Sequence, residues 1–150
     1  MTRINLIKPD DWHLHLRSGE AMKSVVGMSA AQMGRAIIMP NLTPPVKSVR
    51  QAQAYHKEIM KALPVNSDFS PLMALYLTDS TGPKEIAAAA AAPEVYAAKL
   101  YPAGATTNSD NGVTNITSIY PALEAMQKEA VPLLVHGEVT DPEVDVFDRE

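Results

Sequence analysis

Cysteine is absent from the 150 residues of the sequence. Its absence excludes disulfide bonds, zinc sites built from thiolates and cysteine nucleophiles, and it is compatible with a reducing compartment. Long hydrophobic runs are absent too: no segment approaches the roughly 20 apolar residues of a membrane span, and the first residues lack the apolar core of a signal peptide. We therefore expect a cytoplasmic protein whose metal ligands, where it has them, are histidine, asparagine, carboxylates or an unusual lysine.

The sequence also lacks a large excess of charge of either sign. Lysine and arginine number 13 against 17 aspartates and glutamates, which gives a net charge of −4 spread along the sequence. Proteins that bind nucleic acid or an anionic membrane normally carry a basic stripe or cluster, and none is visible. With 46% hydrophobic residues, the chain is long enough for one domain with a core. The composition favours a small-molecule substrate over nucleic acid or a membrane.

Hydrophobic residues follow two spacings along the chain. A spacing of two, or a short continuous apolar run, predicts strands at 11–17, 35–41, 70–78, 95–102 and 131–138. A spacing of three and four predicts helices at 18–34, 48–63, 82–92 and 115–130, and a polar loop of turn-forming residues fills 103–114. Strands that alternate with helices in this way are typical of βαβ units and hence of a parallel sheet.

A glycine-rich phosphate-binding loop is missing after the first strand. The stretch HLHLRSGEAM matches neither the dinucleotide-binding fingerprint nor the Walker A motif, which disfavours an open cofactor-binding sheet. The fold class we expect is α/β, a (β/α)8 barrel of the TIM type. A whole barrel takes about 250 residues, so the sequence accounts for only about the first five βα units. We expect residues 1–150 to form the N-terminal part of a single barrel domain whose remainder lies beyond residue 150.

Polar side chains stand where the predicted strands end: His13, His15, Arg17, Asn41, Thr78, Asp79, Lys99, Tyr101, His136 and Glu138. In a parallel α/β barrel these ends meet at the active site. His13 and His15 lie two residues apart on one strand face, so their imidazoles could hold one cation; a pair of hydrogen-bonded barrel histidines is the alternative. Trp12, on the opposite face, is expected in the core.

Lys99 interrupts the apolar strand VYAAKLY. Either it sits at the sheet rim and extends to solvent, or it points into the barrel mouth, where desolvation would lower its pKa. A neutral amine there can react with CO₂ to give a carbamate, an anionic ligand able to bridge two metal ions. Both interpretations stay open on spacing alone.

Three further polar residues have equally plain alternatives. The guanidinium of Arg17 could hold a substrate carboxylate through two parallel hydrogen bonds, or it could form a surface ion pair with Asp10 or Glu20. Asn41 could serve as a helix cap or turn residue. His136, alone after an apolar run, could be a hydrogen-bonded core histidine.

Several segments taken together resemble a known family. DDWHLHLR, MPNLTPP, AAKLYPAGATTNS and LLVHGEV are similar, in order and spacing, to segments of dihydroorotases of the shorter bacterial and plant type, within the amidohydrolase superfamily. The His-x-His pattern is shared across that superfamily, whereas KLYPAGATTNS and PLLVHGE are more specific. The resemblance implies a metal-dependent barrel hydrolase that interconverts N-carbamoyl-L-aspartate and L-dihydroorotate in pyrimidine biosynthesis, with two zinc ions and a bridging hydroxide.

The resemblance also implies a role for each matching residue. His13 and His15 would bind the more buried zinc, and His136 would bind the second zinc. Lys99 would be carbamylated and bridge both ions. Arg17 and Asn41 would hold the substrate carboxylate, and Thr106 and Thr107 would lie on a flexible loop over the substrate. The family takes its aspartate base, a further zinc-binding histidine and a later substrate-binding histidine from strands beyond residue 150. No catalytic base is therefore expected within 1–150, and this chain alone is expected to be inactive, although the full-length protein would be active as a homodimer.

Two other functions fit part of the pattern. A hydantoinase-like cyclic amidohydrolase would share the metal ligands without needing the carboxylate pair Arg17 and Asn41. A non-catalytic barrel scaffold would bind a partner enzyme, but such relatives usually lose metal ligands, whereas this sequence keeps each one that its length permits.

Overall fold

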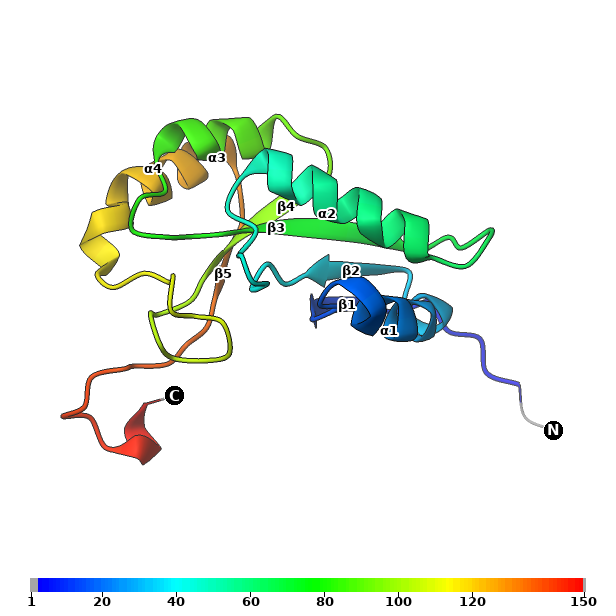
Figure 1. Cartoon of the computed structure of the whole chain (residues 1–150), viewed down its shortest axis with the longest axis horizontal. Coiled ribbons are helices and arrows are strands. Elements are labelled where there is room, and N and C mark those ends of the chain that lie inside the picture. Colours follow the sequence, from blue (N-terminus) through cyan, green and yellow to red (C-terminus); the bar gives the residue numbers. More distant parts are fainter. Residues whose placement is uncertain (1–2, 150) are drawn as a thin grey trace.

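The computed structural model describes residues 3–149 as one curved sheet with helices outside it (Figure 1). The strands are β1 (Asp10–Leu14), β2 (Arg35–Ile38), β3 (Ser70–Tyr76), β4 (Val95–Leu100) and β5 (Leu133–Val135). They are joined by helices α1 (Gly19–Gln32), α2 (Val49–Ala62), α3 (Pro83–Ala90) and α4 (Tyr120–Glu129), with short 3₁₀ turns η1 (Ile116–Ile119) and η2 (Val146–Asp148). Each neighbouring pair of strands is parallel.

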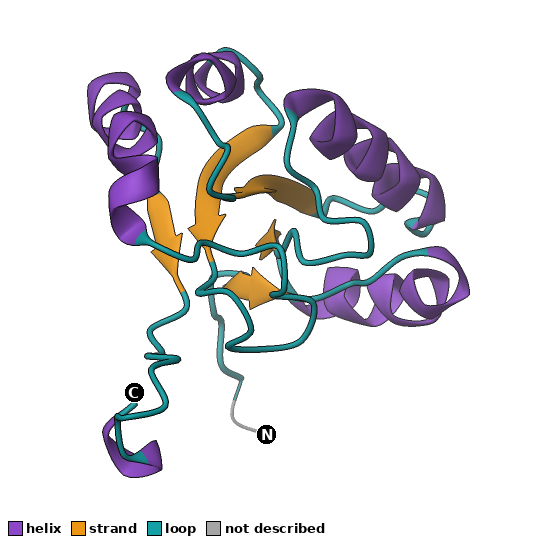
Figure 2. Cartoon of the chain, turned by 60° about the vertical axis from the view of Figure 1, so that its left-hand side comes forward, coloured by secondary structure: helices purple, strands orange, loops and turns teal. Residues whose placement is uncertain are grey.

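The strand order in space is the same as the order in sequence, β1-β2-β3-β4-β5. Every crossover therefore moves the chain one strand further in the same direction, as in a (β/α)8 barrel; a doubly wound sheet reverses direction at its switch point. The helices accordingly gather around the outer side of the sheet (Figure 2). The arrangement is a parallel half-barrel.

Alternate residues of the strands face two different clusters. Ala36, Ile38 and Leu75 belong to the larger core, between the sheet and the helices. Ile37, Met39 and Ala74 form a smaller cluster on the other face, with Leu72 and Leu134 packed against it. Hydrophobic residues on both faces explain why the inner strands read as nearly continuous apolar runs.

Local sequence signals define the helices. Ser48 caps α2 by accepting a hydrogen bond from the Gln51 backbone N–H, and the buried α2 residues Ala52, Tyr55 and Ile59 follow a helical spacing. Pro83 and Pro121 lie in the first turns of α3 and α4, where a missing N–H leaves no hydrogen bond unmade. None of the helices within residues 3–149 is long and apolar enough to cross a membrane.

The predicted elements are all present, but their boundaries differ. β1 ends at Leu14 instead of residue 17, because the backbone turns at Arg17 and Gly19, which both have positive φ. The predicted helix 115–130 is a 3₁₀ turn followed by α4.

The expectation that Trp12 lies in the core is wrong: its side chain is 52% exposed. The pairing of β1 with β2 shifts register between Asp11 and Leu14. Such a bulge breaks the alternation of faces, so Trp12 does not share the buried face of Leu14. The Arg35 guanidinium lies over the indole ring instead, 5.6 Å from its centre.

Candidate metal and substrate site

The two histidines of the first βα unit converge. His13 Nε2 and His15 Nε2 lie 3.1 Å apart, and the ring centres are 5.0 Å apart. Two imidazole nitrogens at this separation could coordinate one cation or share one proton. The predicted placement of both rings on one face of the strand end is therefore observed.

Both imidazoles are biased toward the neutral form. Burial lowers the pKa of His13, with a further contribution from the positive charge of Lys99. Burial likewise lowers the pKa of His15, followed by the charge of Arg17, while a contact with the Asn41 side chain opposes the shift. Neutral imidazole is the form that offers a lone pair to a metal ion.

Lys99 points inward and does not extend to solvent. Its side chain belongs to β4, the residue is 2% exposed, and its Nζ lies 5.2 Å from the centre of the Tyr101 ring. It forms no ion pair with any carboxylate of residues 3–149. Burial lowers the pKa of Lys99, which favours the neutral, nucleophilic amine.

Arg17 is exposed and its alternative ion pairs are not formed. Asp10 pairs with Arg35, and Glu20 pairs with Lys23 at 2.6 Å. The Arg17 guanidinium is thus free of a carboxylate partner among residues 3–149.

Asn41 follows β2 and is 2% exposed. It caps no helix, because Ser48 is the N-cap of the next helix, and it does not lie in a turn. Its Nδ2 donates a hydrogen bond of 2.9 Å to the Thr107 carbonyl, whereas its buried Oδ1 has no hydrogen-bond partner among residues 3–149. Asn108 Nδ2 in turn donates to the Asn41 carbonyl at 2.9 Å. Asn41 and the loop 103–114 therefore hold each other.

His136 lies just after β5, and its Nε2 is 2.9 Å from Glu138 Oε2. Its ring centre is 6.2 Å from that of Tyr101. Thr106 and Thr107 are exposed on the loop 103–114.

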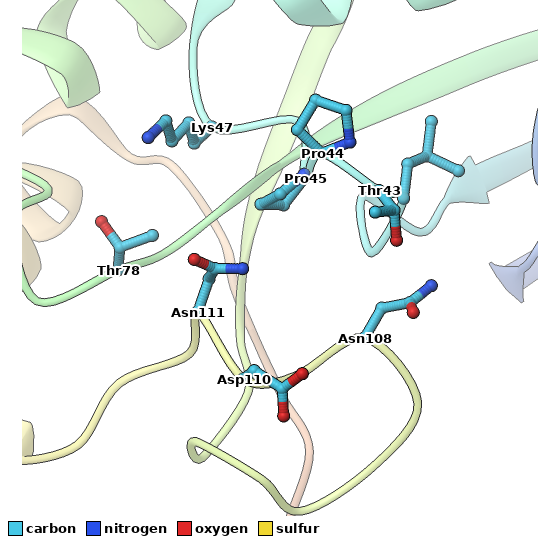
Figure 3. Close-up of a pocket in the computed structure, with 9 residues that line it drawn as sticks. Thr43, Pro44, Pro45, Lys47, Thr78, Asn108, Asp110 and Asn111 are labelled. Atoms are coloured by element: carbon cyan, nitrogen blue, oxygen red, sulfur yellow. The ribbon is translucent and has the colours of Figure 1, made fainter.

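A cavity of about 420 Å³ opens between this loop and the segment after β2 (Figure 3). Asn108, Asp110 and Asn111 line one side, and Thr43, Pro44, Pro45 and Lys47 line the other. None of the predicted metal ligands lines it, so it belongs to the loop and not to the histidine pair.

Two residues that support the site could not be selected from the sequence. Tyr76 donates from its hydroxyl to the Asn108 carbonyl at 3.2 Å, and burial raises its pKa to about 12. Tyr55 donates to the Arg17 carbonyl. The apolar spacing of 48–63 indicates that Tyr55 is buried, but no local signal identifies its partner.

The described residues do not complete a metal site by themselves. Within residues 3–149, no three histidine, cysteine, aspartate or glutamate side chains come together as a group that could hold a metal ion. The converging pair His13 and His15 does fit one ion, and the buried amine of Lys99 lies near enough to act on both rings electrostatically.

Comparison with known proteins identifies the relatives of this chain. No family model matches the sequence. The dihydroorotase of Cupriavidus taiwanensis is 63% identical over 148 residues, which are 99% of this chain and 43% of that protein. The chain is a homologue of the dihydroorotases. A dihydroorotase of Pseudomonas putida is 60% identical over 148 residues, 99% of this chain and 42% of the relative. The chain thus spans less than half the length of these dihydroorotases.

Solved structures of dihydroorotases also resemble this chain. Dihydroorotase from Campylobacter jejuni matches with a TM-score of 0.85 and 41% identity over 95% of this chain and 41% of that one. Dihydroorotase from Saccharomyces cerevisiae, solved with 5-fluoroorotic acid, matches with a TM-score of 0.81 and 34% identity over 91% of this chain and 38% of that one. L-Hydantoinase from Arthrobacter aurescens matches with a TM-score of 0.70 but 14% identity, over 87% of this chain and 29% of that one, and shares the fold alone.

Proposed function

We propose that this chain forms the first four βα units and the fifth strand of a (β/α)8-barrel dihydroorotase, which interconverts N-carbamoyl-L-aspartate and L-dihydroorotate in de novo pyrimidine biosynthesis. The observation that carries the proposal is the convergence of His13 and His15 beside the buried Lys99, in a chain 63% identical to a dihydroorotase over 148 residues.

In this proposal, His13 and His15 would hold one zinc ion, His136 would hold a second, and Lys99 would serve as a ligand in its carbamylated form. When bound, the two ions supply Lewis-acid activation of the amide carbonyl and of water. The chain contributes ligands that are biased toward the required form, because burial lowers the pKa of both imidazoles.

Burial prepares Lys99 for carbamylation in the same way. The Nζ lone pair forms an N–C bond to CO₂, one C=O electron pair moves onto oxygen, and the proton displaced from nitrogen passes to water. The reaction needs the neutral amine, and burial lowers the Lys99 pKa toward that form.

Arg17 and Asn41 bind the substrate carboxylate. The guanidinium offers two parallel donors, and it is free of a carboxylate among residues 3–149. Asn41 Nδ2 adds a third donor once it leaves the Thr107 carbonyl. Thr106 and Thr107 then close over the substrate with their loop.

The aspartate base and the further zinc-binding and substrate-binding histidines come from the part of the relatives' length that this chain does not span. Residues 1–150 alone are therefore expected to be inactive. The homodimer and the cytoplasmic setting expected from the sequence stay predictions.

The test is a chimera in which residues 1–150 replace the matching part of the Cupriavidus taiwanensis dihydroorotase. We expect zinc-dependent turnover of dihydroorotate, abolished by His13→Ala and retained in His56→Ala, a histidine on α2 that has no role in the site. A folded chimera that binds zinc but does not turn over dihydroorotate would contradict the proposal, as would robust turnover by 1–150 alone.

A hydantoinase-like enzyme is the second candidate, supported by the shared fold with the Arthrobacter aurescens enzyme. The Arg17 guanidinium has no carboxylate partner among the residues that the structure describes, which favours a substrate that carries a carboxylate. Faster turnover of hydantoin than of dihydroorotate by the chimera would favour this candidate instead, and a zinc content near zero would favour a non-catalytic scaffold.

A further inference from the structure

The backbone at Arg17 adopts a conformation that its side chain does not favour. Its φ is +60°, in the left-handed region that residues other than glycine, asparagine and aspartate rarely enter. Leu16, just before it, is fully buried, and Gly19 also has a positive φ, +59°. The direction of the guanidinium therefore depends on a tight turn over residues 17–19, and something outside that turn must hold it.

Two residues of α2 make the contacts that hold this turn. The Tyr55 hydroxyl donates a hydrogen bond to the Arg17 carbonyl, and Glu58 Oε1 accepts one of 3.1 Å from the Gly19 backbone N–H. Tyr55 and Glu58 are three residues apart and so lie on the same side of the helix. Helix α2 of the second βα unit is thus hydrogen-bonded to residues 17–19, which connect β1 and α1 in the first unit.

The Tyr55 contact is rigid as well as polar. The residue is 4% exposed and its ring belongs to the main core. Burial raises the pKa of Tyr55, so the hydroxyl keeps its proton and remains a donor at any physiological pH. A hydroxyl fixed by a packed ring sets the position of the carbonyl that accepts from it.

We propose that Tyr55 is a positioning residue for Arg17: its hydroxyl holds the left-handed turn that aims the guanidinium at the substrate carboxylate. Glu58 secures the same turn at Gly19. This inference rests on the proposed function for its substrate, but its structural half, the restraint of residues 17–19, does not.

The chimera described above tests the inference through a double-mutant cycle with Tyr55→Phe and Arg17→Ala. Loss of one hydrogen bond predicts that Tyr55→Phe raises KM for dihydroorotate about five-fold, with kcat within about two-fold of the parent. In the Arg17→Ala background the same change should have no further effect on KM. Tyr120→Phe is the matched control, because that tyrosine is 51% exposed at the start of α4.

Hydrogen exchange of the peptide containing residues 17–19 reports on the turn without any activity. We expect about five-fold faster exchange at Gly19 in Tyr55→Phe and in Glu58→Ala, and no change in Tyr120→Phe. Glu58→Ala, at an exposed position, takes the place of Tyr55→Phe should the latter fail to fold.

Each outcome bears on one of the two proposals. An inactive but folded chimera counts against the proposed function, and exchange at residues 17–19 then still decides the restraint. Unchanged KM in an active chimera, an equal rise of KM in the Arg17→Ala background, or unchanged exchange at Gly19 would each overturn the positioning role of Tyr55.

Discussion

At the scale of single residues, His13 and His15 bring two imidazoles together in surroundings that partly remove them from water. Their folded-state pKa values lie below the ordinary histidine value of 6.5. Below that value the unfolded chain binds more protons than the folded one, so stability is full above about pH 6.5 and falls as the pH drops through the folded pKa.

This gives a pH prediction for the metal-free protein. The Tm of the chimera in chelator should fall as the buffer is changed from about pH 7.5 to about 5.5. His15→Gln should flatten that dependence, because glutamine has no proton to gain. A thermal melt at each pH measures both, and an unchanged slope in His15→Gln would contradict the pKa shift of that ring.

Residue-scale prediction from sequence has a physical limit. Alternation at a strand end is sufficient to place His13 and His15 side by side, and the structure has this feature. Spacing leaves two orientations open for Lys99, and the structure has the buried one. The prediction that Trp12 lies in the core is wrong because the bulge in β1 is a property of strand pairing and not of local sequence. Tyr55 is not predictable as a partner of Arg17, because the two lie 38 residues apart and meet only through the packing of α2. The catalytic roles of these residues stay predictions.

At the scale of elements, the loop 103–114 is folded tightly back on the strand that precedes it. A Cβ atom added to Gly112 would lie 2.4 Å from the Tyr101 carbonyl oxygen and 2.9 Å from that of Ser109. Both neighbours are backbone atoms, so neither can move without disturbing the end of β4. Only glycine fits here.

Gly112→Ala should therefore destabilise the chimera by about 2 kcal/mol, a steric effect on a buried backbone position. Gly82→Ala is the control, since nothing lies within 4 Å of a Cβ at Gly82. Chemical denaturation of the two variants gives the comparison, and equal midpoints would show that the loop yields more easily than its contacts indicate.

The same loop is fastened at its tip by Asn41, Asn108 and Tyr76. Asn108→Ala removes the side-chain bond to the Asn41 carbonyl, and it also places alanine at a φ of +58°. We expect cleavage of the loop by an added protease to accelerate about five-fold or more. Asn111→Ala, a neighbouring exposed position, should leave the cleavage rate unchanged; equal acceleration in both would rule out a specific role for Asn108.

Element boundaries show which signals are local. Apolar spacing and proline positions predict all five strands and four helices, since those signals act within a few residues. The early end of β1 depends on the contact of Arg17 with α2, and the 3₁₀ turn before α4 depends on the contact of Ser118 with Asp79. The spacing of apolar residues along the chain does not indicate such contacts.

At the scale of the whole molecule, the half-barrel leaves apolar surface uncovered. Leu133 and Val135 of β5 are 40% and 54% exposed at the edge of the sheet. An open parallel edge with unpaired backbone groups is a template for association. The βαβ pattern alone does not predict the sequential strand order, because right-handed crossovers also build doubly wound sheets. The missing glycine-rich loop after the first strand favours the barrel, whose strands follow one another in order.

Residues 1–150 alone should therefore self-associate, whereas the chimera should not form higher aggregates. Val135→Lys should reduce the association by placing a charge on the exposed strand, and Val139→Lys, beyond the strand, should not. Light scattering after size-exclusion chromatography measures both. A monodisperse monomer of 1–150 would contradict the account of the open edge.

We propose that the strand ends of this chain supply the first ligands of a dihydroorotase metal site. A crystal structure of the zinc-loaded chimera, grown with bicarbonate, is the decisive test. The account predicts anomalous density about 2.0–2.1 Å from Nε2 of both His13 and His15, a second peak at His136, and a carbamate on Lys99 Nζ between them. Zinc bound elsewhere, or a free Lys99 amine beside a filled histidine pair, would contradict it.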